Sequence, residues 1–446
     1  MSTVKKLLIA IAVLILIAVT TIWILATREK ATIAFDKTVG VAPQIIAPNE
    51  TLLPTMKVAP AVGWKGAETP SVAAGLAVKA FASGLRHPRG IYMLPNGDIL
   101  VSESNSPPRD GENGGGGVVG FVMKTLMARA GAGVPSPNRI MLLRDADGDG
   151  TAELKTVLIS GLNSPSGMAW LNGQLYIGNT DAVVRVAFTP GQTKITAKPV
   201  VVAKLPGGFN HWARNLLLTP DGKSLYVAVG SSSNIAENGM EREAGRAAIH
   251  QIDLATGKDI IYAYGLRNAN QMAFEPDSGA LFTVVNERDM LGSDIVPDYL
   301  TEVQFGGFYG WPWYYWGGVL DKRVDPDPDN LSSYAIRPDY SLGPHVAPLG
   351  LAFGKGAILG HQYVNGAFIA EHGSWNRRPL SGYKVVFVPF ARGKPVGKPS
   401  DVLTGFLSKD DEAHGRPVSL VVDKRGALLV TDDVGGRVWR VTAAAK

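Results

Sequence analysis

The chain has 446 residues, and 46% of them are hydrophobic, which is enough for a full-sized core. Its net charge of +5 is small for this length and forms no basic stripe with interleaved aromatic residues, so nucleic-acid binding is not indicated. There is no cysteine, which excludes disulfides and thiolate metal sites and suits an oxidising compartment.

The first predicted element is a membrane-spanning helix. Residues 7–26 carry no charged side chain, and the run is long enough to cross a bilayer as a helix. A cleaved signal peptide normally has a shorter apolar core and small residues at its cleavage site, and Ile24 and Ala26 make a poor site. The sequence therefore favours an uncleaved anchor, residues 1–30, in the inner membrane, with the folded part exported to the periplasm. Residues 31–74 are predicted to form a linker.

Six copies of one sequence unit follow the linker. Each copy has a polar turn, an apolar run, a tight turn and a second apolar run, which together predict a β-hairpin. The copies begin at Gly84, Gly161, Asn210, Gly265, His345 and His414. Repeated units of this size with short strands are typical of propellers and solenoids.

Third and fourth strands follow most of these hairpins. The last copy has no fourth strand of its own, but residues 75–85 can supply it from the other end of the chain. Residues 75–446 are therefore predicted to form an all-β protein, a six-bladed β-propeller of four-stranded blades. Pairing the two chain ends closes the ring and removes free sheet edges. A β-sandwich of repeated hairpins does not account for the sixfold count.

Polar loops of this propeller are expected to gather on one face. Strands alternate in direction within a blade, so the loop entering the first strand and the loop joining the second and third lie on the same side. Converging guanidiniums there indicate a ligand with several carboxylates or phosphates. The alternative is that they brace loops and pair with Glu287, Asp294 and Asp432. The gathered side chains are His211, His345, His372, His414, Arg267, Arg288, Arg377, Arg416, Asn210, Asn268, Gln271 and Asn376.

Four other stretches have weaker signals. Residues 145–153 begin like a calcium loop but have Thr156 where the twelfth-position glutamate belongs, which favours an acidic turn between blade strands. Residues 113–117 are interpreted as a glycine hinge, and residues 118–130 as a short helix packed on the ring. The aromatic residues 311–316 could wall a sugar site or plug the edge of the pocket.

Five blocks resemble the glucose/sorbosone dehydrogenase family, and most strongly its sorbosone dehydrogenase branch. They are residues 265–274, 284–294, 306–318, 371–382 and 415–436. Members of this family are six-bladed propellers that use pyrroloquinoline quinone (PQQ) and calcium. The likeness extends from about residue 75 to the end of the chain.

The resemblance implies a role for each matched residue. His211 would take the proton from the sugar hydroxyl while hydride passes to the quinone, and Arg267 with Asn268 would contact the quinone oxygens. Main-chain carbonyls of Glu287 and Arg288 would hold calcium. Ser231 stands where the family has an acid beside the histidine, and Asn210 or Glu237 are possible substitutes. Further cofactor contacts would come from Asn286, Asn376, Arg377, His414 and Arg416.

These roles agree with the chemistry of the cofactors. PQQ has three carboxylates for arginines to bind, and calcium prefers oxygen ligands and acts as a Lewis acid on a quinone oxygen. Histidine is a suitable base for a hydroxyl proton. The sequence predicts oxidation of an aldose or sorbosone-like sugar aldehyde, with electrons passing to an unidentified acceptor. The alternatives are a calcium-dependent lactonase and a non-catalytic propeller that binds envelope sugars or proteins.

Overall fold

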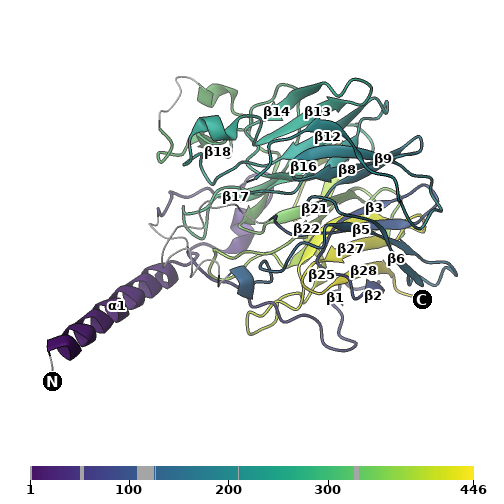
Figure 1. The fold of residues 1–446 in the computed structure, drawn as a ribbon. Helices are drawn as coiled ribbons and strands as arrows, with labels where there is room; N and C mark the ends of the chain where they lie inside the picture. Colours follow the sequence, from purple (N-terminus) through teal and green to yellow (C-terminus); the bar gives the residue numbers. More distant parts are fainter. Residues whose placement is uncertain are drawn as a thin grey trace.

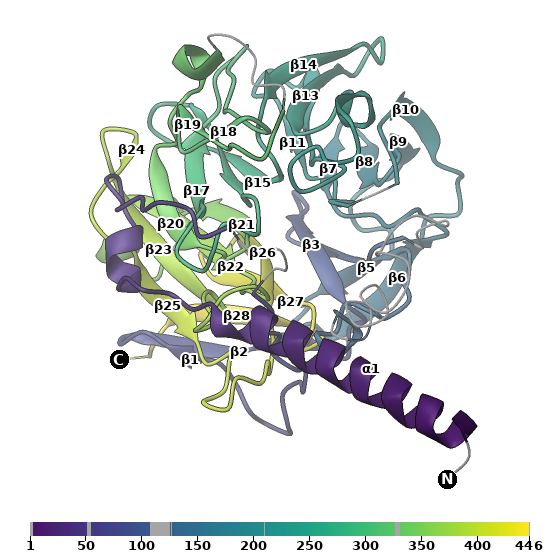
Figure 2. The same ribbon diagram turned by 90° about the vertical axis from the view of Figure 1, so that its left-hand side faces the viewer.

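The computed structural model describes residues 3–50, 55–107, 125, 127–208, 210–325 and 331–445. One long helix, α1 (Thr3–Arg28), stands outside a ring of six antiparallel sheets (Figure 1). Seen along its axis, the ring is a six-bladed β-propeller, which confirms the predicted fold class (Figure 2). The residues predicted as a glycine hinge, and most of those predicted as the short helix after it, lie outside the described residues.

Each blade has four strands, of which the first lies nearest the axis. The first three blades are β3 (Pro88–Met93), β4 (Ile99–Glu103), β5 (Arg139–Arg144) and β6 (Leu154–Ser160); β7 (Met168–Leu171), β8 (Gln174–Asn179), β9 (Ala182–Ala187) and β10 (Val200–Lys204); and β11 (Leu216–Leu218), β12 (Ser224–Val229), β13 (Ala248–Asp253) and β14 (Asp259–Tyr264).

The second half of the ring repeats this plan with small additions. Its blades are β15 (Ala269–Phe274), β16 (Leu281–Val285), β17 (Pro297–Glu302) and β20 (Tyr340–Pro344); β21 (Pro348–Phe353), β22 (Gly366–Glu371), β23 (Lys384–Ala391) and β25 (Ser400–Thr404), extended by β1 (Ser71–Val72) and β24 (Lys394–Pro395); and β26 (Pro417–Val422), β27 (Leu428–Asp432), β28 (Arg437–Ala443) and β2 (Leu76–Ser83). A hairpin of β18 (Tyr314–Tyr315) and β19 (Val319–Leu320) and the short helices η1 (Phe35–Thr38), η2 (Met240–Glu243), η3 (Leu331–Tyr334) and η4 (His361–Tyr363) lie in the connections.

The core is divided among the interfaces between neighbouring blades. Side chains alternate across each strand, so every middle strand feeds two interfaces. In β16, for example, Phe282 and Val284 pack toward blade 5, while Leu281 and Val285 pack toward blade 3. Burying each such side chain stabilises the fold by about 1.5–3 kcal/mol. This arrangement explains why the second strands are apolar on both faces.

The two ends of the chain close the ring. Strand β2 pairs antiparallel with β28, from Leu76 opposite Ala443 to Ser83 opposite Arg437. The prediction that residues 75–85 complete the last blade is therefore confirmed. Because β2 and β28 come from opposite ends of the sequence, the last blade forms only when both ends are in place.

The segment predicted as a linker is bound along the propeller. Gly40 pairs with Ser341 of β20, and Val62 donates from its amide nitrogen to the carbonyl of Ala413. Trp64 packs against Phe406, His414 and Trp439 with ring centroids 5.3–5.6 Å apart. The chain between α1 and β1 therefore runs over the ring surface, where it covers apolar side chains.

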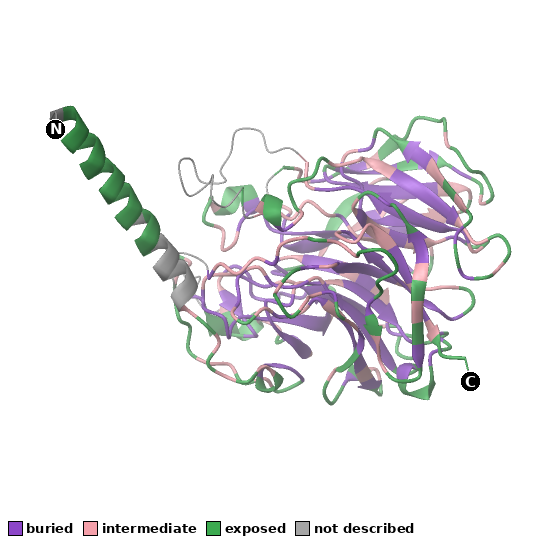
Figure 3. Cartoon of the chain, turned by 90° about the horizontal axis from the view of Figure 1, so that it is seen from below, coloured by how far each residue is buried: buried purple, intermediate pink, exposed green. Residues whose placement is uncertain are grey.

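Helix α1 contacts little of the protein. Its most apolar window, Val4–Thr21, has a mean hydropathy of 2.3 and no share of it is buried against the described residues (Figure 3). It is the one helix among the described residues that is long and apolar enough to cross a membrane, although a signal sequence would pass the same test.

Candidate active site

One face of the ring carries the residues that enter the innermost strands. His87, His211 and His345 stand at this position in blades 1, 3 and 5, with φ of 54°, 53° and 61°. Left-handed backbone is uncommon for residues other than glycine, and it concentrates at functional sites. The loops joining second and third strands lie beside them, and we call this whole surface the site face. Its described loop residues are 104–107, 127–138, 180–181, 230–247, 286–296, 372–383 and 433–436.

The ring of His211 is fixed by the turn that follows β12. Its Nδ1 lies 2.9 Å from the carbonyl oxygen of Ser231 and 3.1 Å from Ser231 Oγ. A carbonyl only accepts, and Ser231 Oγ donates its own hydrogen to the carbonyl of Ser233 at 2.6 Å. Nδ1 therefore carries the proton, and Nε2 of the neutral ring keeps a free lone pair.

His211 is held in this neutral form. Burial lowers its pKa well below the ordinary value, and the nearby charge of Arg267 lowers it further. Of the substitutes considered for the missing acid, Glu237 accepts instead from the amides of Asn234 and Ile235. The carbonyl and hydroxyl of Ser231 itself orient the ring.

A buried carboxylate that the sequence analysis did not single out supports this turn. Glu243 accepts from the amide of Ser232 at 2.7 Å, from Ser232 Oγ at 2.6 Å and from Ser233 Oγ at 2.5 Å. It lies in η2, and 5% of its surface is exposed. Glu243 thus locks the serine turn that orients His211. The clustered Ser231–Ser233 run was the only sequence signal for such an acceptor.

Arg267 and Asn268 lie next to His211. The amide of Ser231 donates to the carbonyl of Arg267 at 2.7 Å. A Cβ added to Gly230 would lie 2.5 Å from Asn268 Oδ1 and 2.5 Å from His211 Cβ, so only glycine allows this approach. Asn286 joins the group, since its amide donates to the carbonyl of Asn268 at 3.1 Å. These four predicted residues form one cluster.

Asp289 connects this cluster to blade 5. Its carboxylate is 3.3 Å from Arg267 Nη2, accepts from Asn376 Nδ2, and lies 3.9 Å from His345 Nδ1. Asp289 stands in the block around Glu287 and Arg288, but sequence reasoning did not single it out. It brings Asn376 and His345 to the same side of the ring as Arg267.

A second cluster forms around Asp433, where blades 5, 6 and 1 meet. Asp433 Oδ2 lies 2.9 Å from His372 Nε2, 2.6 Å from Arg89 Nη1 and 3.7 Å from His87 Nε2. Burial opposes ionisation of Asp433, but His372, His87 and Arg89 hold its pKa well below the ordinary value. Arg89 also lies over the ring of Trp212, with its guanidinium carbon 5.6 Å from the ring centroid. Since Trp212 follows His211, the two clusters adjoin.

Arg416 and His414 belong to the border of this second cluster. Arg416 is buried, donates from Nη2 to Tyr383 OH at 3.3 Å, and leaves Nε without a partner among the described residues. His414 packs edge-on against Trp64. Arg416 therefore offers a free donor at the site face, whereas His414 is engaged with the segment that follows α1.

Two of the gathered arginines brace the structure instead of facing the site. Arg288 is fully buried and donates to Glu287 Oε2, to Asp321 and to the carbonyls of Pro312 and Tyr314. Arg377 donates to the carbonyls of Ser293 and Pro379 and lies over Phe35. For these two, the alternative of loop bracing describes the geometry, and the cofactor contact of Arg377 stays a prediction.

The carbonyl oxygen of Glu287, predicted to bind calcium, is already bound by Arg267. Arg267 Nη1 donates to the carbonyl of Glu287 at 2.6 Å and lies 3.4 Å from that of Asn286. A guanidinium on this oxygen opposes a second cation there. The residues therefore do not fit calcium in this arrangement.

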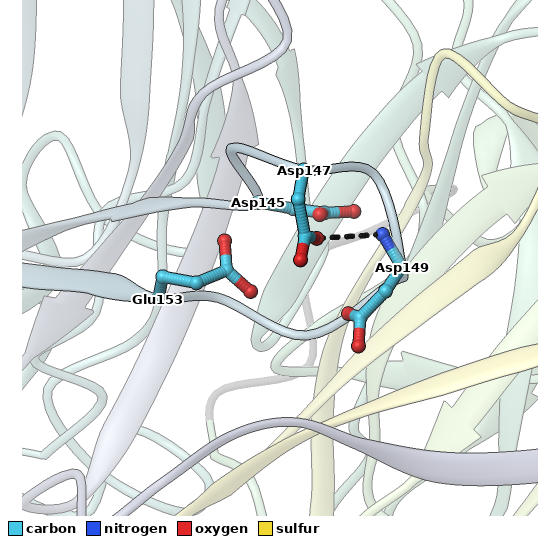
Figure 4. Close-up of side chains that lie close together, drawn as sticks. All are labelled: Asp145, Asp147, Asp149 and Glu153. Carbon is cyan, nitrogen blue, oxygen red and sulfur yellow. Dashed lines mark hydrogen bonds between the residues drawn. The ribbon is translucent and has the colours of Figure 1, made fainter.

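Acidic side chains do gather elsewhere, at the turn between β5 and β6. The carboxylates of Asp145, Asp147, Asp149 and Glu153 approach one another there, the one such group among the described residues (Figure 4). Asp145 already accepts from Arg425 Nη1 at 3.0 Å and from two amides of its own turn. The turn lies on the face opposite the site face, as an acidic turn between blade strands.

A pocket of about 660 Å³ opens on the site face beside Asp433. Its lining includes His87, Arg86, Arg129 and Asp433, and its size lies in the range of small-molecule sites. Deeper on the axis, residues from all six blades leave a void of only about 20 Å³. The six inner strands therefore pack closely at this level of the axis, and the larger pocket lies on the site face beside the Asp433 cluster.

Fold and site together define a propeller with a polar ligand site at one end of its axis. The sequence model of the TrAA12-like family matches residues 126–298 and 325–444, more than half of the chain. The chain belongs to this family. The predicted resemblance to PQQ-dependent sugar dehydrogenases is thereby confirmed, and the sorbosone branch stays a prediction.

The chain is also similar to individual known proteins. A protein of Borreliella burgdorferi is 30% identical over 295 residues, and the match covers 63% of this chain and 76% of the length of that protein. The pyrroloquinoline quinone-dependent pyranose dehydrogenase of Coprinopsis cinerea is 25% identical over 430 residues, covering 83% of this chain; the chain spans 54% of that protein's length. A Trichoderma reesei enzyme of carbohydrate-active family AA12 has the same fold, with a TM-score of 0.68 at 20% identity, covering 87% of this chain and 99% of its own.

Proposed function

We propose that this protein is a PQQ-dependent sugar dehydrogenase that oxidises an aldose or a related, sorbosone-like sugar aldehyde. The observation that carries the proposal is His211, whose Nε2 has a free lone pair beside Arg267 and Asn268 on the site face. The named activity of the Coprinopsis cinerea relative supports the choice of cofactor and substrate class.

The chain's own residues supply the acid–base chemistry. His211 Nε2 takes the proton of a sugar hydroxyl or hydrated aldehyde, because Nδ1–H is committed to Ser231. Asn268 would hold and polarise the oxygens of the hydride acceptor from the adjacent turn. Arg267, whose guanidinium is bound to Asn234, Glu287 and Asp289, would add its positive charge beside them. PQQ, when bound, supplies the carbon that accepts the hydride.

The residues present fit the anionic cofactor at one end of the site. Arg416 has a free Nε at a buried position, which is a donor suited to a carboxylate. Asp433 brings a negative charge nearby, but the guanidinium of Arg89 neutralises it. Asn376 lies on the same face, on the far side of Asp289 from Arg267.

Calcium has no role in the proposed chemistry, because Arg267 donates to the Glu287 carbonyl that was predicted to bind the ion. Binding the ion at Glu287 would require Arg267 to turn away from this oxygen. The proposed chemistry therefore needs no calcium, and reconstitution is carried out both with and without the ion.

The proposed location is the inner membrane, with the propeller in the periplasm. Helix α1 supports this location through its apolar, unburied surface. The absence of cysteine agrees with an oxidising compartment.

Reconstitution tests the proposed function. Purified protein is titrated with PQQ, with Ca²⁺ or with EDTA, and its absorption spectrum is measured before and after a panel of aldoses and sugar aldehydes is added. We expect PQQ to bind and at least one sugar to bleach the quinone spectrum. If PQQ does not bind in either arm, the proposed function is wrong.

A further inference from the structure

The end of helix α1 is clamped onto the site face without an intervening linker. Glu29, the residue after the helix, accepts from the amide of Ser293 at 2.8 Å through Oε1. Its Oε2 accepts from Ser293 Oγ at 2.6 Å and from Thr55 Oγ1 at 2.5 Å. A carboxylate with three donors has a defined position, so the first residue beyond the helix is fixed to the ring.

The next residues extend this clamp. The amide of Ala31 donates to the carbonyl of Arg378 at 2.7 Å, and both the amide and Oγ1 of Thr32 donate to Asp294 Oδ2, at 2.6 and 2.7 Å. Arg378 in turn donates to the carbonyl of Met56 at 2.9 Å. The helix end is therefore held by two loops of the propeller and by a second pass of its own segment.

These two loops are the ones that build the candidate site. Ser293 and Asp294 lie in the same loop as Glu287 and Asp289. Arg378 lies in the same loop as Asn376, two residues after it. Asp289 joins them, since it contacts both Arg267 and Asn376. Two views at right angles show α1 leaving the ring on this side (Figures 1 and 2). The attachment point and the site thus share one face.

We propose that the site face lies against the bilayer surface and that its electrons leave to a lipid-soluble quinone dissolved in that bilayer. This rests on the proposed function and on α1 as the anchor. A membrane helix with a flexible linker would let the propeller turn in any direction, but the Glu29–Thr32 clamp leaves no slack for such turning. The site then opens toward the interface where membrane quinones diffuse.

The electron balance of this step closes. Each sugar oxidised loses two electrons and two protons. The bilayer quinone takes up both and becomes the quinol, which restores the site for the next sugar. No water-soluble carrier is needed.

Orientation is measured first, independently of activity. Because the chain has no cysteine, single-cysteine variants can be labelled cleanly. Asn238→Cys places a fluorophore on an exposed loop of the site face in blade 3, and Lys223→Cys places one on the exposed turn at the opposite end of the same blade. In liposomes with nitroxide-headgroup lipids, we expect strong quenching of the first label and little of the second. Equal quenching, or stronger quenching at residue 223, would overturn the proposal.

A linker insertion then tests the clamp. About twenty Gly/Ser residues inserted after Arg28 keep the anchor but release the ring. We expect the quenching at residue 238 to fall, and quinone reduction in proteoliposomes to fall several-fold, with turnover by a water-soluble dye unchanged. Unchanged quinone reduction would contradict the proposal. If the protein without the insertion reduces no dye with any sugar, the proposed function is wrong, whatever the orientation of the ring. If mass spectrometry shows that the mature protein lacks residues 1–28, there is no anchor and the membrane proposal is wrong.

Discussion

In the proposed function, a single ring nitrogen carries the acid–base chemistry of the site. His211 Nε2 is free to accept a proton because Nδ1–H is donated to the carbonyl of Ser231 and because burial keeps the imidazole neutral. The same orientation by a backbone carbonyl recurs at His87, whose Nδ1 lies 2.8 Å from the carbonyl of Ser104. There, however, Nε2 faces the carboxylate of Asp433 at 3.7 Å. The two histidines share a backbone position, but only His211 presents a free lone pair.

The positioning role of Glu243 can be tested by removing its charge. Glu243→Gln keeps the size of the side chain but cannot accept from three donors at once. We expect the serine turn to loosen and kcat to fall about 10- to 100-fold with little change in KM. The pH profile of kcat should shift as well, which a merely structural role would not cause. Glu241→Gln, at an exposed position of the same short helix η2, is the matched control and should behave like the wild type.

Acid sensitivity is predicted from His372. Burial lowers its pKa to about 4, so below the ordinary value of 6.5 the unfolded chain binds a proton that the folded chain does not. The stability contributed by His372 is complete above pH 6.5 and is lost as the pH falls toward 4. Between pH 6.5 and 4, we expect the free energy of unfolding of His372→Gln to fall by about 1–3 kcal/mol less than that of the wild type, measured by urea unfolding. Parallel stability curves for variant and wild type would contradict the assignment.

At the scale of elements, the turns that enter the inner strands bring the site together. Gly230 directly follows β12, where the turns of blades 3 and 4 touch, and it lies between His211 and Asn268. The strands supply a rigid frame, and residues with left-handed backbone stand in the turns that enter the inner strands of blades 1, 3 and 5. The geometry of the site therefore depends on backbone contacts between blades.

A methyl group at Gly230 should separate the two halves of the cluster. Gly230→Ala puts a Cβ 2.5 Å from Asn268 Oδ1 and from His211 Cβ, closer than real contacts allow. We expect a stability loss of about 1–3 kcal/mol and a larger proportional loss of sugar oxidation. The melting temperature and the rate of quinone reduction are the two readings. Full activity in a folded variant would show that the turns do not meet as described.

The elements differ in how far the sequence could predict them. Hairpins and ring closure were predictable, because apolar runs and tight turns depend on local sequence and the strand count demanded a partner for β28. The roles of Arg288 and Arg377 were not, since a guanidinium that braces a loop and one that faces a ligand look alike in sequence. Asp289 and Asp433 were missed for the same reason, because each has partners from other blades, Asn376 and His345 for Asp289 and Arg89 for Asp433.

At the scale of the whole molecule, the segment between α1 and the ring acts as a strap. It was predicted to be a linker, because its Pro- and Ala-rich composition does not reveal which surface it covers. Trp64 fills a position between Phe406, His414 and Trp439, and its Nε1 donates to Asp432 Oδ2 at 2.7 Å. The strap thus contributes to the core between the last two blades.

Removing this tryptophan should weaken the whole ring. Trp64→Ala leaves a cavity and takes one donor from the buried carboxylate of Asp432, so we expect a loss of about 3–5 kcal/mol. Denaturant unfolding measures it. Tyr334→Ala, at an aromatic side chain that is 69% exposed, is the control and should change stability by less than about 0.5 kcal/mol. Equal effects of the two substitutions would mean that the strap adds nothing to the fold.

The central claim is that His211 removes the substrate proton. It is tested most directly by mixing PQQ-loaded protein with sugar under anaerobic conditions and following the quinone spectrum in wild type, His211→Ala and the exposed control His361→Ala. We predict equal PQQ binding in all three proteins and a rate of PQQ reduction by sugar that falls about 10²- to 10⁴-fold in His211→Ala alone. A His211→Ala variant that binds PQQ and reduces it at the wild-type rate would contradict it.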